Sequence, residues 1–146
     1  VAYDVYSLIN PGIGYGLGRV GELPDCLSLR DFAEKMKSVL NASFVRMVGP
    51  ENRVIKTVAV CGGSGADLIR EAAQAGADVL VTGDVKYHDA QEAQNLGLAV
   101  LDAGHFATER PVLDTIAAYL ERSGIENGWS VSIETDKLAR DVFRAL

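Results

Sequence analysis

Cysteine is scarce in this chain of 146 residues, which contains only Cys26 and Cys61. Two distant thiols without a Cys-x-x-Cys spacing argue against a disulfide framework and against a thiolate zinc site. No stretch approaches the roughly 20 apolar residues that a membrane-spanning helix needs. No signal-peptide pattern opens the chain either. These absences predict a protein of the reducing cytoplasm that has no membrane partner.

Basic residues are outnumbered, with 14 Lys and Arg against 20 Asp and Glu, for a formal net charge of −6. Nucleic-acid binding draws most of its affinity from Lys and Arg, so a nucleic-acid partner is not expected. Apolar residues make up 48% of the chain and charged residues 23%, which is ordinary for a globular protein. The length predicts a single α/β domain over residues 1–146 with one hydrophobic core.

Short apolar runs alternate with amphipathic segments along most of the chain. The runs are typical of strands buried on both faces, and units of this length imply parallel strands joined by right-handed crossovers. The sequence therefore predicts an α/β fold with a mainly parallel sheet and helices on both faces. The expected strands are residues 17–23, 44–48, 54–60, 79–81, 98–101 and 129–133, and the later helices are 67–74, 87–95 and 108–122.

The ends of these helices carry recognisable signals. Ser28 is placed to cap a helix whose first turn holds Asp31, and Phe32, Met36 and Leu40 then share one face. Each of the three later helices is followed by a glycine, the residue best suited to a left-handed terminating position. Those glycines are Gly76, Gly97 and Gly124.

Ligands bind at the carboxyl ends of the strands in open parallel sheets, so the turns after the inner strands are informative. Three turns, at residues 61–65, 82–84 and 102–105, should lie at one edge of the sheet. Both histidines of the chain belong to this region. The polar residues expected there are Ser64, Thr82, Asp84, His88, Asp102, His105 and Glu109.

His105 and Glu109 are four residues apart, which on a helix places them on one face. They are therefore able to bind one cation, or simply to hydrogen-bond each other at a helix start. An imidazole and a carboxylate suit zinc, iron, manganese or nickel, and two ligands do not distinguish among these metals. Pro111 fits the first turn of the helix, which suggests that His105 precedes regular helix.

Asp84 and His88 have the same spacing. Asp84 is a candidate cap for the following helix or an acid that orients a metal-bound histidine. His88 is a candidate ligand, a proton shuttle or a solvent-facing helix residue. The glycine-rich turn at residues 62–65 allows either close approach to an anion or tight packing against a neighbouring element, although it lacks the Lys of a phosphate-binding P-loop.

Four blocks resemble the NIF-three-like dinuclear metal-centre family, whose members are commonly labelled homologues of the type two GTP cyclohydrolase. These blocks lie in order at residues 16–24, 58–65, 82–88 and 104–109. The resemblance extends from Tyr3 to about Ile133. It implies a NIF-three-like fold, a hexameric ring, and a pair of divalent metal ions bound by histidines and carboxylates, of which His105 and Glu109 match two. The family's other ligands precede the first block, where this chain has no histidine, so the chain is expected to be the carboxyl-terminal part of a longer member.

Three functions are compatible with these observations. The first is a metal-dependent hydrolase acting on an unidentified small molecule, in which His105 and Glu109 bind metal and Asp84 or His88 assists proton transfer. The second is a non-catalytic metal-binding scaffold whose ring binds partner proteins. The third is nucleotide binding at residues 62–65, which lacks a matching cation. We expect the chain to self-associate and, on its own, to hold little metal.

Overall fold

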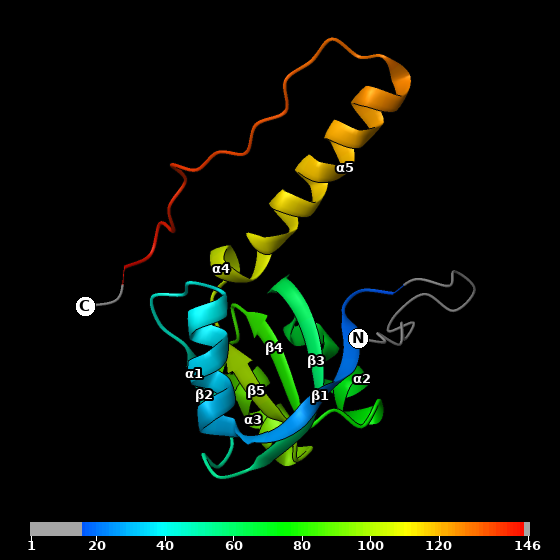
Figure 1. Cartoon of the computed structure of the whole chain (residues 1–146). Helices are drawn as coiled ribbons and strands as arrows, with labels where there is room; N and C mark the ends of the chain where they lie inside the picture. Colours follow the sequence, from blue (N-terminus) through cyan, green and yellow to red (C-terminus); the bar gives the residue numbers. More distant parts are fainter. Residues whose placement is uncertain (1–15, 145–146) are drawn as a thin grey trace.

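The computed structural model describes residues 16–144, which form a five-stranded sheet with helices around it (Figure 1). The strand order is β1-β3-β4-β5-β2. The strands are β1 (Arg19–Ser28), β2 (Arg46–Val48), β3 (Val54–Ser64), β4 (Val79–Gly83) and β5 (Ala99–Asp102). The helices are α1 (Leu29–Val39), the short 3-10 helix η1 (Ala66–Leu68), α2 (Ile69–Gln74), α3 (Tyr87–Asn95), α4 (His105–Glu109) and α5 (Pro111–Asn127).

The three inner strands are parallel, as the sequence predicts. β3 pairs with β4 and β4 pairs with β5 in parallel register. The two outer strands, β1 and β2, run antiparallel to their neighbours, so the complete sheet is mixed. The expectation of a mainly parallel sheet therefore holds for the three inner strands, whereas the two edge strands are antiparallel to their neighbours.

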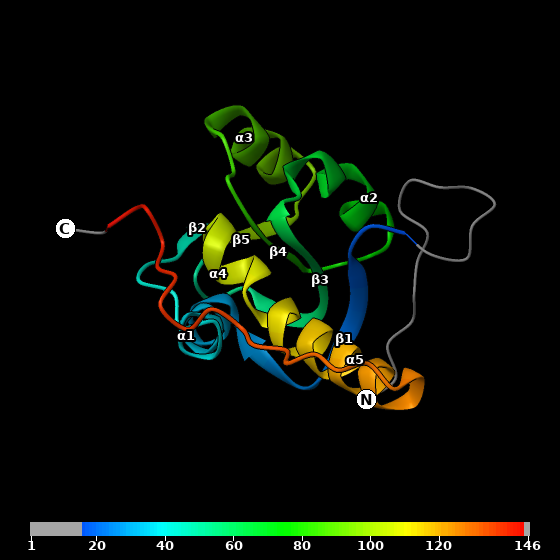
Figure 2. The same cartoon turned by 90° about the horizontal axis from the view of Figure 1, so that it is seen from above.

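Helices cover both faces of the sheet, which confirms the predicted layers (Figures 1 and 2). On one face, Phe32 of α1 packs with Val79 and Val81 of β4. On the other face, Leu80 packs in a second cluster with Ile69 of α2, which Ala93 of α3 also joins. Neighbouring residues of β4 thus serve opposite faces, because strand side chains alternate. Full burial of a side chain of this size contributes about 1.5–3 kcal/mol.

Several predicted helix ends are confirmed. The Ser28 hydroxyl accepts a hydrogen bond from the Asp31 backbone N–H at 3.1 Å, as expected of a cap. Gly76 and Gly97 have φ of 75° and 70°, the left-handed conformation that ends α2 and α3. The proposed capping role of Asp84 is wrong: α3 begins after Lys86, whose backbone N–H donates to Asp89 instead.

The predicted end of the last long helix is also wrong. α5 continues through Gly124 to Asn127 and is terminated by Gly128, which is left-handed with φ of 67°. Gly124 remains helical, and a side chain there would meet Trp129 at an ordinary contact distance of 3.5 Å. Pro111 occupies the first turn, as expected. His105 lies outside the long helix but begins the short helix α4, so it does not precede all regular helix.

The strand predicted at residues 129–133 is not formed. Residues 129–133 are irregular in the structure, and no strand pairs with them in the described part of the chain. α5 extends away from the sheet and holds this segment beyond the reach of the strand edges (Figure 1). A strand needs a neighbour to satisfy its backbone donors and acceptors, so the alternating pattern is not sufficient by itself.

Two remaining expectations concern cysteines and membranes. Cys26 and Cys61 are both free in the structure. Partial burial raises the pKa of the Cys61 thiol. Across residues 16–144, no helix combines the length and apolar character required to cross a membrane.

Candidate metal centre

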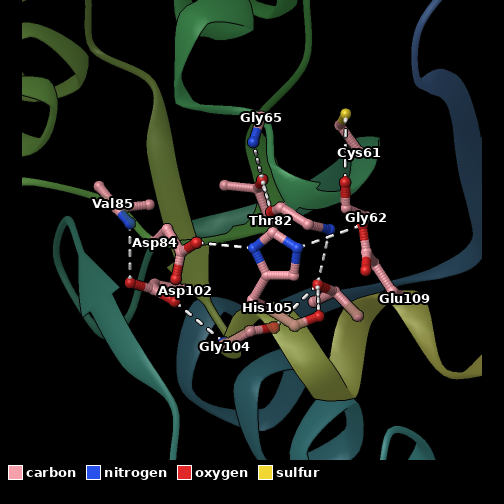
Figure 3. Close-up of polar contacts among 12 residues, drawn as sticks. Cys61, Gly62, Gly65, Thr82, Asp84, Val85, Asp102, Gly104, His105 and Glu109 are labelled. Carbon is pink, nitrogen blue, oxygen red and sulfur yellow. Dashed lines mark hydrogen bonds and ion pairs between the residues drawn. The ribbon is translucent and has the colours of Figure 1, made fainter.

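The loops after β4 and β5 meet at the edge of the sheet where α4 begins (Figure 3). Asp84 follows β4, and His105 is the first residue of α4. Glu109, one helical turn later, projects from the same face of α4. The fold thus brings together three residues that the sequence predicts at this edge: Asp84, His105 and Glu109.

The imidazole of His105 lies between two carboxylates. Its Nδ1 is 2.6 Å from Oδ2 of Asp84, and its Nε2 is 3.3 Å from Oε1 of Glu109. The three side chains are about half exposed, at 47% for His105, 49% for Asp84 and 56% for Glu109. Because Asp84 engages Nδ1, the other ring nitrogen faces Glu109 and the open side of the site.

These carboxylates change the protonation of the histidine. The hydrogen bond with Asp84 and, to a smaller extent, the negative charge of Glu109 raise the pKa of His105 above its ordinary value of 6.5. Partial burial acts in the opposite direction and is outweighed. The protonated imidazole is therefore stabilised relative to that of a free histidine, since it interacts with a carboxylate on each side.

The backbone around Asp84 is unusually constrained. Asp84 adopts φ of 56°, a left-handed conformation that is uncommon for residues other than glycine, although Asp and Asn tolerate it. The preceding Gly83 packs directly against the next loop: a Cβ atom there would lie 2.6 Å from the carbonyl carbon of Gly104. The turn that places Asp84 beside His105 thus requires a glycine before it.

The Asp102 side chain connects the loops that follow β4 and β5. This side chain is nearly buried, with 5% exposure. Its carboxylate accepts hydrogen bonds from the backbone N–H of Val85 at 3.1 Å and of Gly104 at 3.0 Å, and it forms an ion pair with Arg46. Asp102 therefore fixes the backbone on both sides of the site, whereas Asp84 is the acid that contacts His105.

The glycine-rich segment at residues 62–65 packs against α4. The Gly63 N–H donates to the Thr108 hydroxyl at 2.9 Å, and the Gly65 N–H donates to the Thr82 hydroxyl at 2.8 Å. A Cβ at Gly63 would lie 2.6 Å from Oε1 of Glu109. Of the two alternatives for this segment, the structure supports tight packing, because these two N–H groups are already satisfied.

His88 lies apart from the cluster. It is exposed on α3, where its Nδ1 is 3.2 Å from Oε1 of Gln91. Within residues 16–144, no hydrogen bond or ion pair connects His88 with Asp84, His105 or Glu109.

The sequence patterns do not single out Arg46, because its partner Asp102 is distant in the sequence. Thr108 lies in the block at residues 104–109, but its contact with the Gly63 backbone likewise joins distant positions.

His105 and Glu109 fit one metal ion. Two donor atoms that each lie about 2.0–2.2 Å from a shared cation are necessarily close to each other, and the observed 3.3 Å between Nε2 and Oε1 satisfies this condition. The hydrogen bond from Nδ1 to a carboxylate is the usual support of a metal-binding histidine. Within residues 16–144, however, no group of three or more His, Cys, Asp or Glu side chains is arranged to hold a metal.

Comparison with known families gives a match over most of the chain. The model of the Duf34/NIF3 (NGG1p interacting factor 3) family matches residues 4–141. A Bacillus subtilis protein named GTP cyclohydrolase 1 type 2 homolog is 47% identical over 107 residues, which are 73% of this chain and 29% of that protein. A Staphylococcus aureus protein of the same name is 38% identical over 128 residues, covering 88% of this chain and 32% of the relative. The chain thus spans about a third of the curated relatives it matches.

Solved structures give the same result. A Bacillus cereus protein related to NIF3 superposes with a TM-score of 0.86 at 36% identity, over 90% of this chain and 36% of that one. A protein from Staphylococcus aureus superposes with a TM-score of 0.85 at 36% identity, over 91% of this chain and 43% of its own length. A third structure, named protein ybgI of unknown function, has a TM-score of 0.67 at 30% identity and covers 82% of this chain and 47% of its own.

Proposed function

This chain belongs to the Duf34/NIF3 family, and we propose that it supplies His105 and Glu109 to a divalent-metal centre that hydrolyses a small molecule. The observation that carries the proposal is the alignment of Asp84, His105 and Glu109. One carboxylate holds Nδ1, and Nε2 faces the second carboxylate at 3.3 Å. The names of the relatives are compatible with a hydrolytic activity but do not identify its substrate.

The remaining ligands come from outside the described residues. Metal sites in proteins usually have three or four protein ligands, and this site offers two. Relatives extend well beyond the matched region, and a second chain is another source of ligands. We therefore propose that a complete site binds two divalent ions and that His105 and Glu109 are part of its ligand set.

The residues of this chain have distinct roles in the proposal. When bound, a pair of divalent ions supplies an activated water, whose pKa falls towards about 7, and polarises the bond under attack. His105 and Glu109 hold the ions, and Asp84 fixes the tautomer and orientation of His105. Asp84 and His88 were both predicted as candidates to assist proton transfer. Asp84 contacts His105 and remains a candidate for this role. His88 receives no role, since it pairs with Gln91 on α3.

The first experiment measures metal content. For this chain alone, we expect little bound metal and almost no effect of His105→Ala, because two ligands give a weak site. In a family member of full length, the substitution matching His105→Ala should lower metal affinity about 10–100-fold or more, since even the loss of a supporting residue has effects of this size. The substitution matching His88→Ala is the control. Equal metal affinity in these two variants would refute the proposed ligand.

A second function is favoured by the surface of α5. Val112, Ile116 and Tyr119 are exposed apolar residues on one side of this helix, which suits a scaffold that assembles and binds partner proteins. The metal-loaded full-length protein distinguishes the two functions. The hydrolase is supported if the protein has phosphatase or GTP-hydrolysis activity and the substitution that matches His105→Ala abolishes it. A stable, metal-loaded assembly that is inactive on both substrates supports the non-catalytic scaffold.

A further inference from the structure

A groove of about 620 Å³ runs beside the proposed metal ligands. We call it the Arg46 groove. Its walls include Phe44 and Arg46 next to β2, and His105, Phe106 and Glu109 of α4. Residues 140–143 line it as well. The groove therefore combines the guanidinium groups of Arg46 and Arg140 with two half-buried aromatic rings and the proposed metal ligands.

Arg46 is anchored by only one of its nitrogens. Nη2 donates to the carbonyl oxygen of Val85 at 2.9 Å and forms the ion pair with Asp102. Arg46 and Asp102 also face each other in the pairing of β2 with β5, so backbone register reinforces this contact. In the described residues, no further hydrogen bond engages Nη1 or Nε. Their N–H groups are available to a ligand.

Most of the Arg46 side chain remains accessible although it pairs with Asp102. Asp102 is nearly buried and already accepts two backbone N–H groups, whereas the Arg46 side chain is 63% exposed. An anchored guanidinium presents its donors in a fixed plane, which matches the oxygens of a phosphate or carboxylate. The negative charges of Asp84 and Glu109 oppose such an anion until metal ions balance them.

We propose that Arg46 binds the oxyanion of the ligand, a phosphate or carboxylate group, while the apolar body of the ligand lies against Phe44 and Phe106. The placement of the reacting group beside His105 and Glu109 rests on the proposed function. The binding of the anion by Arg46 is independent of that function. Aromatic rings offer large apolar contact areas at low entropic cost, which suits a flat or apolar ligand body.

Three small probes test this inference by isothermal titration calorimetry. Phenylphosphonate and benzoate carry a ring with an oxyanion, and benzyl alcohol carries the ring alone. Each is titrated into the wild-type chain, Arg46→Gln and the control Arg70→Gln, without added metal. Arg70 is a matched control, because it is 69% exposed and pairs with Glu92 outside the groove.

We expect the wild type and Arg70→Gln to bind at least one anion more tightly than benzyl alcohol. Arg46→Gln should weaken anion binding about tenfold or more, because charged hydrogen bonds are lost. It should leave benzyl alcohol unaffected. A preference for phenylphosphonate indicates a phosphate ligand, and a preference for benzoate indicates a carboxylate.

Several results would overturn the inference. These are equal anion binding by Arg46→Gln and Arg70→Gln, benzyl alcohol binding as tight as that of the anions, and no anion binding by the wild type. If Arg46→Gln does not fold, Arg46→Lys replaces it, since it keeps the charge beside Asp102 but loses the planar donor pair; wild-type affinity in that variant counts against the proposal. Failure of the proposed metal centre in a full-length family member would leave this result unaffected, because the titrations that compare Arg46 with Arg70 contain no metal.

Discussion

Both the backbone conformation at Gly63 and the closeness of Glu109 require a residue without a side chain at this position. Its φ is 69°, and a Cβ atom would lie 2.6 Å from Oε1 of Glu109. We expect Gly63→Ala to lower the free energy of unfolding by about 1–2 kcal/mol, the usual penalty of a left-handed conformation. It should also displace the Glu109 carboxylate and weaken metal binding in a complete site. Urea titration and metal titration measure the two effects.

Gly76→Ala is the matched control for this prediction. Gly76 has a similar φ of 75°, but no atom lies within 4 Å of the added Cβ. It should lose a comparable amount of stability and keep its metal affinity. Equal metal affinities in the two variants would show that Gly63 acts through the backbone alone.

The contact between Asp84 and His105 should be measurable as a pH dependence. Because the folded state raises the pKa of His105, this contact stabilises the fold below the unfolded-state pKa, and the contribution is lost as the pH rises through the folded-state pKa. Asp84→Asn should therefore cost more stability at about pH 5.5 than at about pH 8.5, and it should lower the pKa of His105 in an NMR titration of the metal-free protein. A pH-independent difference, or an unchanged His105 pKa, would contradict the proposed contact.

At the scale of elements, the end of α5 depends on two glycines four residues apart. Gly124 is helical, so Gly124→Ala should raise the free energy of unfolding by about 0.4–1 kcal/mol, and the new methyl would contact Trp129. Gly128 has φ of 67°, so Gly128→Ala should lower it by about 1–2 kcal/mol. Thermal or urea unfolding measures both changes. Effects of the same sign would mean that the helix ends elsewhere.

Sequence patterns predict some elements of this fold and miss others. The inner strands were predicted because burial on both faces leaves a continuous apolar run, and α3 was predicted at Tyr87–Asn95 with its terminating Gly97. The end of α5 was not, because Gly124 and Gly128 look alike in sequence and only the backbone angles distinguish them. The strand at 129–133 failed for a different reason: its alternating pattern is present, but no neighbouring strand is available.

Some contacts of the candidate site also follow from sequence patterns, and others do not. The facing of His105 and Glu109 follows from helical spacing, and the approach of Asp84 follows from the shared edge of parallel strands. The partnership of Arg46 with Asp102 was not predictable, because it depends on β2 adding antiparallel to β5 across 56 positions of sequence. Local patterns give the chemistry of one element, and contacts between distant elements require the assembled sheet.

At the scale of the whole molecule, α5 exposes a stripe of apolar side chains. Val112, Ile116 and Tyr119 are 51%, 46% and 57% exposed and follow the spacing of a single helix face. We expect the chain to self-associate at high concentration through this stripe. Ile116→Glu should shift sedimentation towards monomer, whereas Ala118→Glu, which adds the same charge at an exposed position away from the stripe, should not. A wild-type chain that is monomeric throughout would contradict this prediction.

The position of Trp129 has an optical consequence. It is the single tryptophan of the chain, and it lies half exposed just beyond α5, within contact distance of Gly124. Selectively excited tryptophan emission therefore reports on the end of α5 and is insensitive to the sheet. Covering of the indole shifts its emission to shorter wavelength. The unmodified chain thus contains its own fluorescent label for events at this end of the molecule, separate from any signal at His105.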